Sequence, residues 1–409
     1  MRGLCAAASL FVCLVSAAPA AMPGFTNAEF AARRQAMRRT LGKSVLALYG
    51  YTARDVDELR TGFYQEPNFL YLTGWNEPGA ILLLTSESET LFLPPRNAAV
   101  ERYTGAKIAP GDTQASEATG FDQVLSVAQF EAQFAKAAES AEAVLTVRDR
   151  RDLPARLERL TPKREIRDAR APIAALRAKK SPAEIAWIEK ATQVSMDAHR
   201  AAWRRIKPGV FEYQAAATMV FAMLDRNCRT AYTPIIASGP NGPVLHYAEN
   251  SRQIGNGELI VMDVAASCGE YASDITRTVP SSRKFTPRQR ELYEAVLGAG
   301  KAAIAAVRPG ATMQEINKIA KDYLEAHGKL GKYLTHGISH GVGLEAHDAP
   351  AHTSQDKFEP GMVITIEPGV YLPEESTGIR IEDLVLVTAT GARVLSAALP
   401  KDPATSNVR

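Results

Sequence analysis

The chain lacks the features that would assign it to several common classes of protein. Its net charge is only +3 at pH 7, because 48 lysines and arginines are nearly balanced by 45 aspartates and glutamates in 409 residues. So small an imbalance argues against nucleic acid as a partner. The 4 cysteines are too few for a disulfide framework in a chain of this length.

Long hydrophobic runs are also scarce, and the clearest one lies at the N-terminus. Arg2 gives a positive start, Leu4 to Ala18 an apolar core, and Ala18-Pro19-Ala20 a small-residue cleavage site. This is the pattern of a secretory signal peptide, which we expect over residues 1–21. The run is too short to span a bilayer comfortably, so we expect no membrane span. The mature chain is predicted to be exported to the periplasm or outside the cell.

Export would decide which cysteines remain. Cleavage near Ala21 removes Cys5 and Cys13 and leaves Cys228 and Cys268. An exported protein can form disulfides. Two cysteines do not make a framework, however, and we expect them to be buried free thiols.

The length of the chain predicts two domains. Residues 22–165 alternate short strands with helices, and Thr26-Asn27-Ala28-Glu29 is a capping box that begins a helix reaching Leu41. This pattern predicts a smaller α/β N-terminal domain. A basic stretch punctuated by prolines, 162–172, marks its boundary. Strands are expected at 44–49, 80–84, 90–93 and 143–147, and a helix at 127–140.

Residues 166–400 predict an α+β domain, because helices alternate with antiparallel hairpins. Ser181-Pro182-Ala183-Glu184 combines a capping box with proline in the first turn, and begins a long helix to Trp203. Residues 401–409 are polar and are predicted to form a flexible tail. Further helices are expected at 212–226, 287–307 and 312–327.

Two predicted hairpins in this second domain each carry a pair of carboxylates. The first hairpin is expected to turn at Cys268-Gly269 and the second at Glu374-Glu375. With those turns, the two carboxylates of each hairpin lie directly opposite each other on one sheet face. The pairs are Asp263 with Asp274 and Glu367 with Glu382.

Opposed carboxylates repel each other. At about 5 Å and an effective dielectric constant of about 20, the repulsion is about 3 kcal/mol per pair. Acidic residues of a single hairpin are commonly solvated, but Asp263 and Glu367 each end an apolar run typical of a buried strand. Buried carboxylates are rare unless they are paired or bind a metal. Oxygen ligands favour hard or borderline divalent cations, so the two pairs predict a metal site.

Histidines add to this cluster. All 7 follow the domain boundary, and the segment 335–347 holds three of them with three glycines between. Glycine lets the backbone approach a ligand closely. One histidine in such a loop is more often a surface or core residue, but three beside a carboxylate cluster favour a functional site. They are His336, His340 and His347.

The same segment contains a motif of a different enzyme class. Gly337-Ile338-Ser339-His340-Gly341 fits G-x-S-x-G, the nucleophile elbow of serine hydrolases, which needs a buried strand before it and a helix after it. Residues 329–333 make a poor strand, and Asp348 and Pro350 make a poor helix. We therefore disfavour a serine hydrolase. Inhibition by a serine-reactive phosphonate rather than by a chelator would favour it.

The acidic and histidine motifs resemble those of the pita-bread metallopeptidases, which include aminopeptidase P, prolidase and methionine aminopeptidase. The family's ligands follow the order Asp, Asp, His, Glu, Glu. Here they match Val-Met-Asp-Val, Ser-Asp-Ile-Thr-Arg-Thr, Gly-Ile-Ser-His-Gly-Val-Gly, Thr-Ile-Glu-Pro-Gly-Val-Tyr and Ile-Arg-Ile-Glu-Asp. The resemblance implies a pita-bread catalytic domain with two divalent metal ions, and this ligand set suits Mn²⁺. The implied ligands are Asp263, Asp274, His340, Glu367 and Glu382.

The resemblance also implies residues that meet the substrate. His246 lies in a segment similar to one whose histidine lines the family's substrate site, and His347 matches a second such histidine. His336 matches a third position, found in the proline-specific branch. Arg380 is two residues from Glu382, hence on the same sheet face. Its role stays open between binding substrate and forming a salt bridge with the ligand carboxylates.

Two N-terminal segments, 66–78 and 91–97, resemble the N-terminal domain of aminopeptidase P, although Asn97 stands where an acidic residue is commoner. The implied activity is hydrolysis of the first peptide bond when proline is the second residue. Prolidase restricted to Xaa-Pro dipeptides is the alternative, since it uses the same ligands. A metal-free, peptide-binding pita-bread protein is an alternative of another class. The resemblance further implies a homodimer or homotetramer.

The expected chemistry follows from the residue types. Two ions about 3.5–4 Å apart would lower the pKa of a shared water, and the bridging hydroxide would attack the scissile carbonyl. Glu367 is expected to act as general base or proton shuttle as well as ligand. His246 and His347 are expected to stabilise the oxyanion or hold the peptide.

Overall fold

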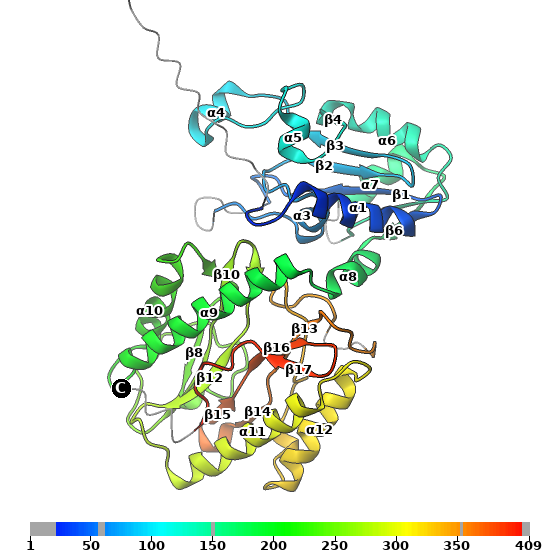
Figure 1. Cartoon of the computed structure of the whole chain (residues 1–409). Coiled ribbons are helices and arrows are strands. Elements are labelled where there is room, and N and C mark those ends of the chain that lie inside the picture. The colour runs from blue at the N-terminus through cyan, green and yellow to red at the C-terminus, as the bar shows by residue number, and fades with distance from the viewer. Residues whose placement is uncertain (1–21, 56–61, 149–151, 352–354, 403–409) are drawn as a thin grey trace, which may run out of the picture. The chain divides into compact units, whose positions relative to one another are not determined.

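The structure is a computed structural model that describes residues 22–55, 62–148, 152–351 and 355–402. It divides into two compact units, Met1–Asp168 and Ala169–Arg409 (Figure 1). The predicted signal peptide and most of the predicted tail lie outside the described residues. Within the described part of the chain, no helix is both long enough and apolar enough to cross a membrane.

The first unit contains a six-stranded sheet in the order β4-β3-β2-β1-β5-β6. The pairs β1–β2 and β2–β3 are antiparallel, whereas β3–β4, β1–β5 and β5–β6 are parallel. The strands are β1 (Val45–Tyr49), β2 (Ile81–Leu84), β3 (Glu89–Leu93), β4 (Val124–Ser126), β5 (Ala143–Thr146) and β6 (Glu165–Asp168). The helices are α1 (Asn27–Leu41), α3 (Pro67–Thr73), α4 (Ala98–Thr104), α5 (Ala115–Thr119), η1 (Val127–Gln129), α6 (Phe130–Ala138) and α7 (Asp152–Leu160).

Helix caps explain two features of this unit. Thr26 caps α1 by accepting a hydrogen bond from the Glu29 backbone N–H, as the sequence predicts. Asn97 caps α4, because its side chain accepts from the backbone N–H groups of Ala99 and Val100. An amide at that position therefore serves the local fold as an N-cap.

Within its described residues, the second unit contains α8, two helix pairs and four small antiparallel sheets. One hydrophobic cluster joins α9 and α10 to β8, β9 and β10, and another joins α11 and α12 to β13–β16. The helices are α8 (Arg170–Ala178), α9 (Pro182–Arg205), α10 (Glu212–Leu224), α11 (Pro287–Ala306), α12 (Met313–Ala326), η2 (Gly239–Asn241), η3 (Gly331–Tyr333) and η4 (Pro373–Glu375). The strands are β7 (Arg229–Thr230), β8 (Ile235–Ser238), β9 (Leu259–Asp263), β10 (Ala266–Cys268), β11 (Tyr271–Ala272), β12 (Thr276–Pro280), β13 (Val363–Ile366), β14 (Gly369–Leu372), β15 (Thr377–Arg380), β16 (Asp383–Val387) and β17 (Ala392–Val394).

Both predicted hairpins are present, but only one has the predicted register. In the second hairpin, Ile366 pairs with Asp383 and Gly369 with Arg380, which places Glu367 opposite Glu382 as predicted. In the first hairpin, Cys268 pairs with Tyr271, so the turn is Gly269-Glu270.

The prediction that Asp263 faces Asp274 is therefore wrong, because Asp263 pairs with Thr276. The physical reason is the turn: Gly269 and Glu270 both have positive φ, +55° and +70°. A Cβ on Gly269 would lie 2.7 Å from the Trp187 ring, so glycine is required there.

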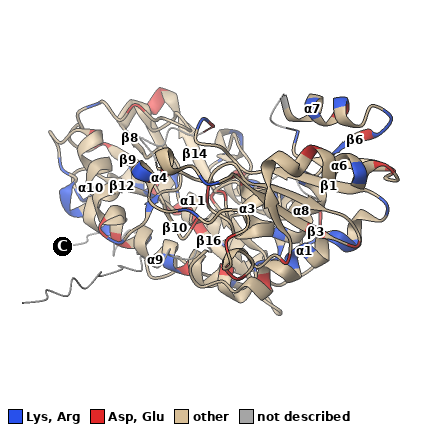
Figure 2. Cartoon of the chain, turned by 90° about the horizontal axis from the view of Figure 1, so that it is seen from above, with Lys and Arg blue, Asp and Glu red and all other residues tan. Residues whose placement is uncertain are grey.

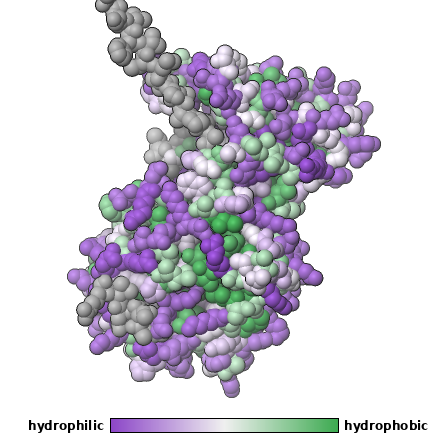
Figure 3. Space-filling model, in the orientation of Figure 1, coloured by the Kyte–Doolittle hydropathy of each residue, from purple (hydrophilic) through white to green (hydrophobic). Residues whose placement is uncertain are grey.

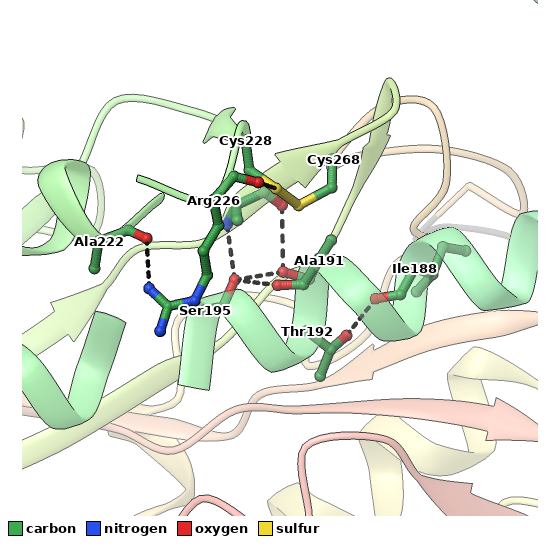
Figure 4. The surroundings of a disulfide bond; sticks show 10 residues. Ile188, Ala191, Thr192, Ser195, Ala222, Arg226, Cys228 and Cys268 are labelled. Atoms are coloured by element: carbon green, nitrogen blue, oxygen red, sulfur yellow. Dashed lines mark hydrogen bonds between the residues drawn. A yellow bond between two sulfur atoms is a disulfide. The ribbon is translucent and has the colours of Figure 1, made fainter. Parts of the chain in front are cut away.

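The prediction of free thiols is also wrong: Cys228 and Cys268 form a disulfide (Figure 4). Cys228 immediately precedes β7, and Cys268 ends β10. Because Ser267 pairs with Arg229 in the β7–β10 ladder, the two cysteines lie directly opposite each other. The cysteines are 40 residues apart in the sequence, and the number of cysteines alone does not indicate that they pair.

Removing this disulfide is expected to destabilise the protein. The crosslink closes a loop of 40 residues, for which a chain-entropy account gives a stabilisation of about 4 kcal/mol. The double variant Cys228→Ala, Cys268→Ala should therefore lose about 2–4 kcal/mol of unfolding free energy in urea. The natural protein, denatured without reductant, should titrate no thiol from this pair. Two reactive thiols before reduction would contradict the bond.

The surface carries mixed charge. In the view of Figure 2, Lys and Arg segments are interspersed with Asp and Glu segments in both units. On the face shown in Figure 3, hydrophobic residues gather within the second unit and hydrophilic ones surround them.

Candidate metal centre and active site

Four carboxylates lie where the two hairpins pass from one small sheet to another. The first hairpin leaves the β8–β9–β12 sheet and continues into the β7–β10–β11 sheet, and the second passes from β13–β16 to β14–β15. At such crossings the ladder opens and side chains can turn toward a ligand. Asp263 ends β9, Asp274 precedes β12, Glu367 lies between β13 and β14, and Glu382 between β15 and β16.

The two hairpins are joined at this point. The Glu382 backbone N–H donates to the Thr276 carbonyl at 3.0 Å, and the Thr276 hydroxyl donates to Glu382 Oε2 at 2.7 Å. The carboxylates of both hairpins therefore converge. All nine residues predicted for the site line one cavity of about 570 Å³.

His340 completes the cluster. Its Nε2 lies 3.6 Å from Asp274 Oδ2 and 3.4 Å from Glu367 Oε1. Ligand atoms of Asp274, His340 and Glu382 all lie within 4.8 Å of one another. Nδ1 lies 3.0 Å from the Gly341 carbonyl, which can only accept, so Nδ1 carries a proton and Nε2 is the nitrogen that can face a cation. This is the tautomer that a metal-binding histidine needs.

Asp263 is held from two sides. Arg380 Nη2 donates to Asp263 Oδ2 at 2.5 Å, which establishes the salt bridge that the sequence left open for Arg380. The Tyr232 hydroxyl lies 2.5 Å from Oδ1 of both Asp263 and Asp274. Tyr232 was not predicted, and nothing in its spacing from the aspartates indicates this contact.

The buried carboxylates of the cluster repel one another, and bound cations would neutralise them. Burial raises the pKa of Asp274, Glu367 and Glu382 well above the ordinary values, and neighbouring carboxylates raise them further. Burial also raises the pKa of Tyr232, with Asp263 adding to the shift. Buried carboxylates around one imidazole nitrogen are the donor set of a hard or borderline divalent ion. The residues present therefore fit a metal centre.

The three other histidines predicted for the site line the same cavity. His347 stacks on His340, with ring centroids 4.0 Å apart and an interplanar angle of 22°. Nε2 of His336 is 2.8 Å from the Tyr371 hydroxyl, and burial lowers the pKa of His336 to about 4. His246 is exposed, next to Leu245, whose carbonyl accepts a hydrogen bond from Arg380 at 3.4 Å.

Buried ion pairs hold the loop that carries His347. Arg177 Nη2 lies 2.9 Å from Asp348 Oδ1, and Asp348 also accepts from the backbone N–H groups of Leu344 and Ala349. Burial alone would raise the pKa of Asp348, but Arg177, Lys180 and a backbone N–H hold it below its ordinary value. The loop is thus tied down next to the metal ligands.

The serine of the G-x-S-x-G motif is not placed for nucleophilic catalysis. Ser339 is fully buried, and its hydroxyl has no hydrogen-bond partner among the described residues. A 3-10 helix precedes the motif at Gly331–Tyr333, and no helix follows it up to Pro350. The expected strand–turn–helix context is missing from this described segment.

Comparison with known proteins agrees with this geometry. The model of "Metallopeptidase family M24" matches residues 186–389, and that of "Aminopeptidase P, N-terminal domain" matches residues 30–146. The Xaa-Pro aminopeptidase of Escherichia coli (strain K12) is 31% identical over 432 residues, which cover 93% of this chain and 97% of that protein. The chain belongs to metallopeptidase family M24. It falls in the family's aminopeptidase P group.

Other M24 members are similar over most of their length. The Xaa-Pro aminopeptidase of Haemophilus influenzae is 33% identical and covers 83% of this chain and 86% of that protein. The structure of proline aminopeptidase P II from Yersinia pestis has a TM-score of 0.85 at 28% identity, covering 94% of this chain and 99% of that one. Zn-substituted Escherichia coli aminopeptidase P in complex with product also gives 0.85 at 28% identity, with 94% and 98% covered.

Membership of M24 confirms the predicted fold class, an α+β pita-bread catalytic domain preceded by a smaller α/β N-terminal domain. It also confirms a metallo-exopeptidase. The family uses divalent metal ions, and in this chain the side chains of Asp274, His340 and Glu382 lie close enough together to hold one.

Proposed function

We propose that this protein is an exported Xaa-Pro aminopeptidase with two divalent metal ions. The observation that carries the proposal is the intact set of five ligand residues around one cavity, in a chain that also has the aminopeptidase P N-terminal domain. A metal-free peptide-binding protein is disfavoured because such a protein has no need to keep buried, mutually repelling carboxylates.

The proposed ligands are the four carboxylates and His340. Bound there, two ions would supply charge neutralisation and an activated water. Glu367 is the proposed proton shuttle, since its carboxylate lies beside His340 and 4.0 Å from His336 Nδ1. His246 and His347 would hold the peptide or the developing oxyanion from the cavity wall. Mn²⁺ is the proposed ion, because carboxylates dominate the ligand set.

Arg380 has a proposed role shared between the ligands and the substrate. Its guanidinium is buried, bonds Asp263, and also donates to the Tyr371 hydroxyl at 3.0 Å. His336 contacts the same hydroxyl. Tyr371 therefore connects Arg380 with His336. We propose that Arg380 and His336 form the part of the cavity wall that receives the proline ring.

The substrate preference is tested by comparing kcat/KM for an Xaa-Pro-Xaa tripeptide and an Xaa-Pro dipeptide, both with Mn²⁺. We expect both to be cleaved at the first bond, because the chain matches Xaa-Pro aminopeptidases over nearly its whole length. Matched Xaa-Ala peptides are the control for proline specificity. Cleavage of the dipeptide alone would replace the aminopeptidase by a prolidase, and equal rates on Xaa-Ala would reject the proline pocket.

Prolidase is the second candidate because Xaa-Pro dipeptidases are also similar to this chain. The Xaa-Pro dipeptidase of Pyrococcus furiosus is 40% identical over 224 residues, a higher identity than to the aminopeptidases. That match covers only 54% of this chain and 64% of that protein. The Xaa-Pro dipeptidase of Pyrococcus horikoshii is 33% identical over 342 residues, which cover 81% of this chain and 91% of that protein. The aminopeptidase is favoured because the match to the Escherichia coli enzyme extends further, over 93% of this chain and 97% of that protein.

Export is proposed from the N-terminal pattern of charge, apolar core and small residues. The Cys228–Cys268 disulfide supports it, since disulfides persist in oxidising compartments. Protein taken from its natural host should begin near Ala21 or Met22 by N-terminal sequencing. Recovery of a chain beginning at Met1 from the cytoplasm would contradict export. We further propose a homodimer or homotetramer, to be measured by light scattering.

A further inference from the structure

One buried histidine is unused by the proposed chemistry. His199 lies on α9 and is fully buried in the second unit. Its Nε2 is 3.1 Å from the Val264 carbonyl and 3.2 Å from the Ile275 carbonyl. These two residues directly follow Asp263 and Asp274. The imidazole thus contacts both arms of the first hairpin, at the residue that follows each of its two proposed ligands.

We propose that His199 is a positioning residue of the metal centre, whose Nε2–H fixes the separation of Asp263 and Asp274 by binding the carbonyl that follows each. This inference rests on the two-metal centre of the proposed function. It assigns His199 no contact with substrate or ion.

The proton position follows from the acceptors. Both partners are carbonyl oxygens, which only accept, so Nε2 carries the hydrogen and shares it between them in a three-centre bond. Burial, together with the nearby positive charge of Arg277, lowers the pKa of His199 to about 4. The ring is therefore neutral at neutral pH, with its single N–H directed at the hairpin.

The hairpin needs this support at that point. Asp263 ends β9 and Asp274 precedes β12, so the ladder is open between them. The backbone bond that continues it, from the Val264 N–H to the Ile275 carbonyl, is long at 3.4 Å. A side-chain donor that bridges both carbonyls restrains the hairpin at this long backbone hydrogen bond.

A second residue of α9 anchors the same opening one turn earlier. Ser195 Oγ accepts from the Ala266 backbone N–H at 2.8 Å and lies 2.7 Å from Ser273 Oγ. The serine also donates to the Ala191 carbonyl of its own helix (Figure 4). Positions four apart share one helix face, so α9 presents Ser195 and His199 side by side to the open hairpin.

The other ring nitrogen argues against simple core filling. His199 Nδ1 is buried and has no hydrogen-bond partner among the described residues. An unsatisfied buried polar atom destabilises a fold, and an apolar side chain of similar volume would avoid that cost. Stability alone therefore gives no reason for imidazole, whereas a required donor at Nε2 does.

The test compares two amides at this position. In His199→Gln the amide nitrogen can reach the place of Nε2, whereas in His199→Asn it can reach only that of Nδ1. We expect His199→Asn to weaken Mn²⁺ binding by about 10- to 100-fold and to lower kcat with KM unchanged. His199→Gln should restore most of both. Metal dissociation constants are measured by calorimetry on the full chain, and kcat at saturating Mn²⁺.

The matched control is Thr192→Val on the same helix. Thr192 is equally buried, but its hydroxyl donates to Ile188 of α9 and not to the hairpin. It should leave Mn²⁺ affinity unchanged. Equal Mn²⁺ affinities in the Asn, Gln and natural proteins would overturn the role of His199. A natural protein that binds no divalent ion would instead reject the proposed function itself.

Discussion

Asp274→Asn is expected to lower kcat by about 10³-fold or more and to prevent full metal loading. Asp274 lies in one group of possible ligand atoms with His340 and Glu382, and an amide would remove the negative charge that Asp274 would offer to a cation there. A metal ion contributes several kcal/mol to stabilising charge in the transition state, and each 1.36 kcal/mol is a factor of about ten in rate. Metal content after dialysis and steady-state kinetics with Mn²⁺ measure the two effects.

The fold should survive this substitution. Asparagine has the shape of aspartate and can keep the hydrogen bond from the Tyr232 hydroxyl. Glu374→Gln is a matched control, because it removes the same charge from the exposed tip of the second hairpin. It should bind metal and turn over normally. Full activity of the natural protein after complete chelation would refute the metal centre altogether.

The first hairpin shows why a wrong register still predicted residues that line one cavity. The sequence predicts a turn at Cys268-Gly269, whereas the structure turns at Gly269-Glu270. Moving the turn by one residue moves the partner of Asp263 by two, from Asp274 to Thr276. Because side chains alternate with a period of two, a shift of two leaves both aspartates on one face. The metal prediction depends on that face and not on direct opposition.

Residues that meet only through the tertiary fold were not predictable in this way. Tyr232 lies 31 and 42 residues from the aspartates it contacts, and Arg177 lies 171 residues before Asp348. Neither residue lies in a local sequence motif that indicates its partner. The sequence around a buried polar side chain does not show which distant residue it will contact. The five proposed ligands could be named from the sequence because their motifs follow the fixed order of the family they resemble. The remaining contacts depend on how α9 and the loops pack around the hairpins.

His347→Ala is expected to lower kcat by about 10²-fold while both metal ions stay bound. The His347 ring lines the cavity and stacks on His340, yet it is not part of the ligand group of Asp274, His340 and Glu382. It is exposed, whereas His340 is buried. An exposed imidazole beside a ligand can donate to a bound peptide or its oxyanion, and that interaction disappears with the ring.

His327→Ala is the control for this variant. His327 is also exposed and also stacks on a ring, that of Tyr323, but it lies at the end of α12 and does not line the cavity. It should leave kcat unchanged. His347→Ala is assayed for kcat, KM and metal content on the same sample, with unfolding in urea as a check. Loss of metal or of stability would show that His347 supports His340 structurally. A kcat that falls with metal and fold intact places its role in the chemistry, because only groups that act in the transition state change the rate without changing the site.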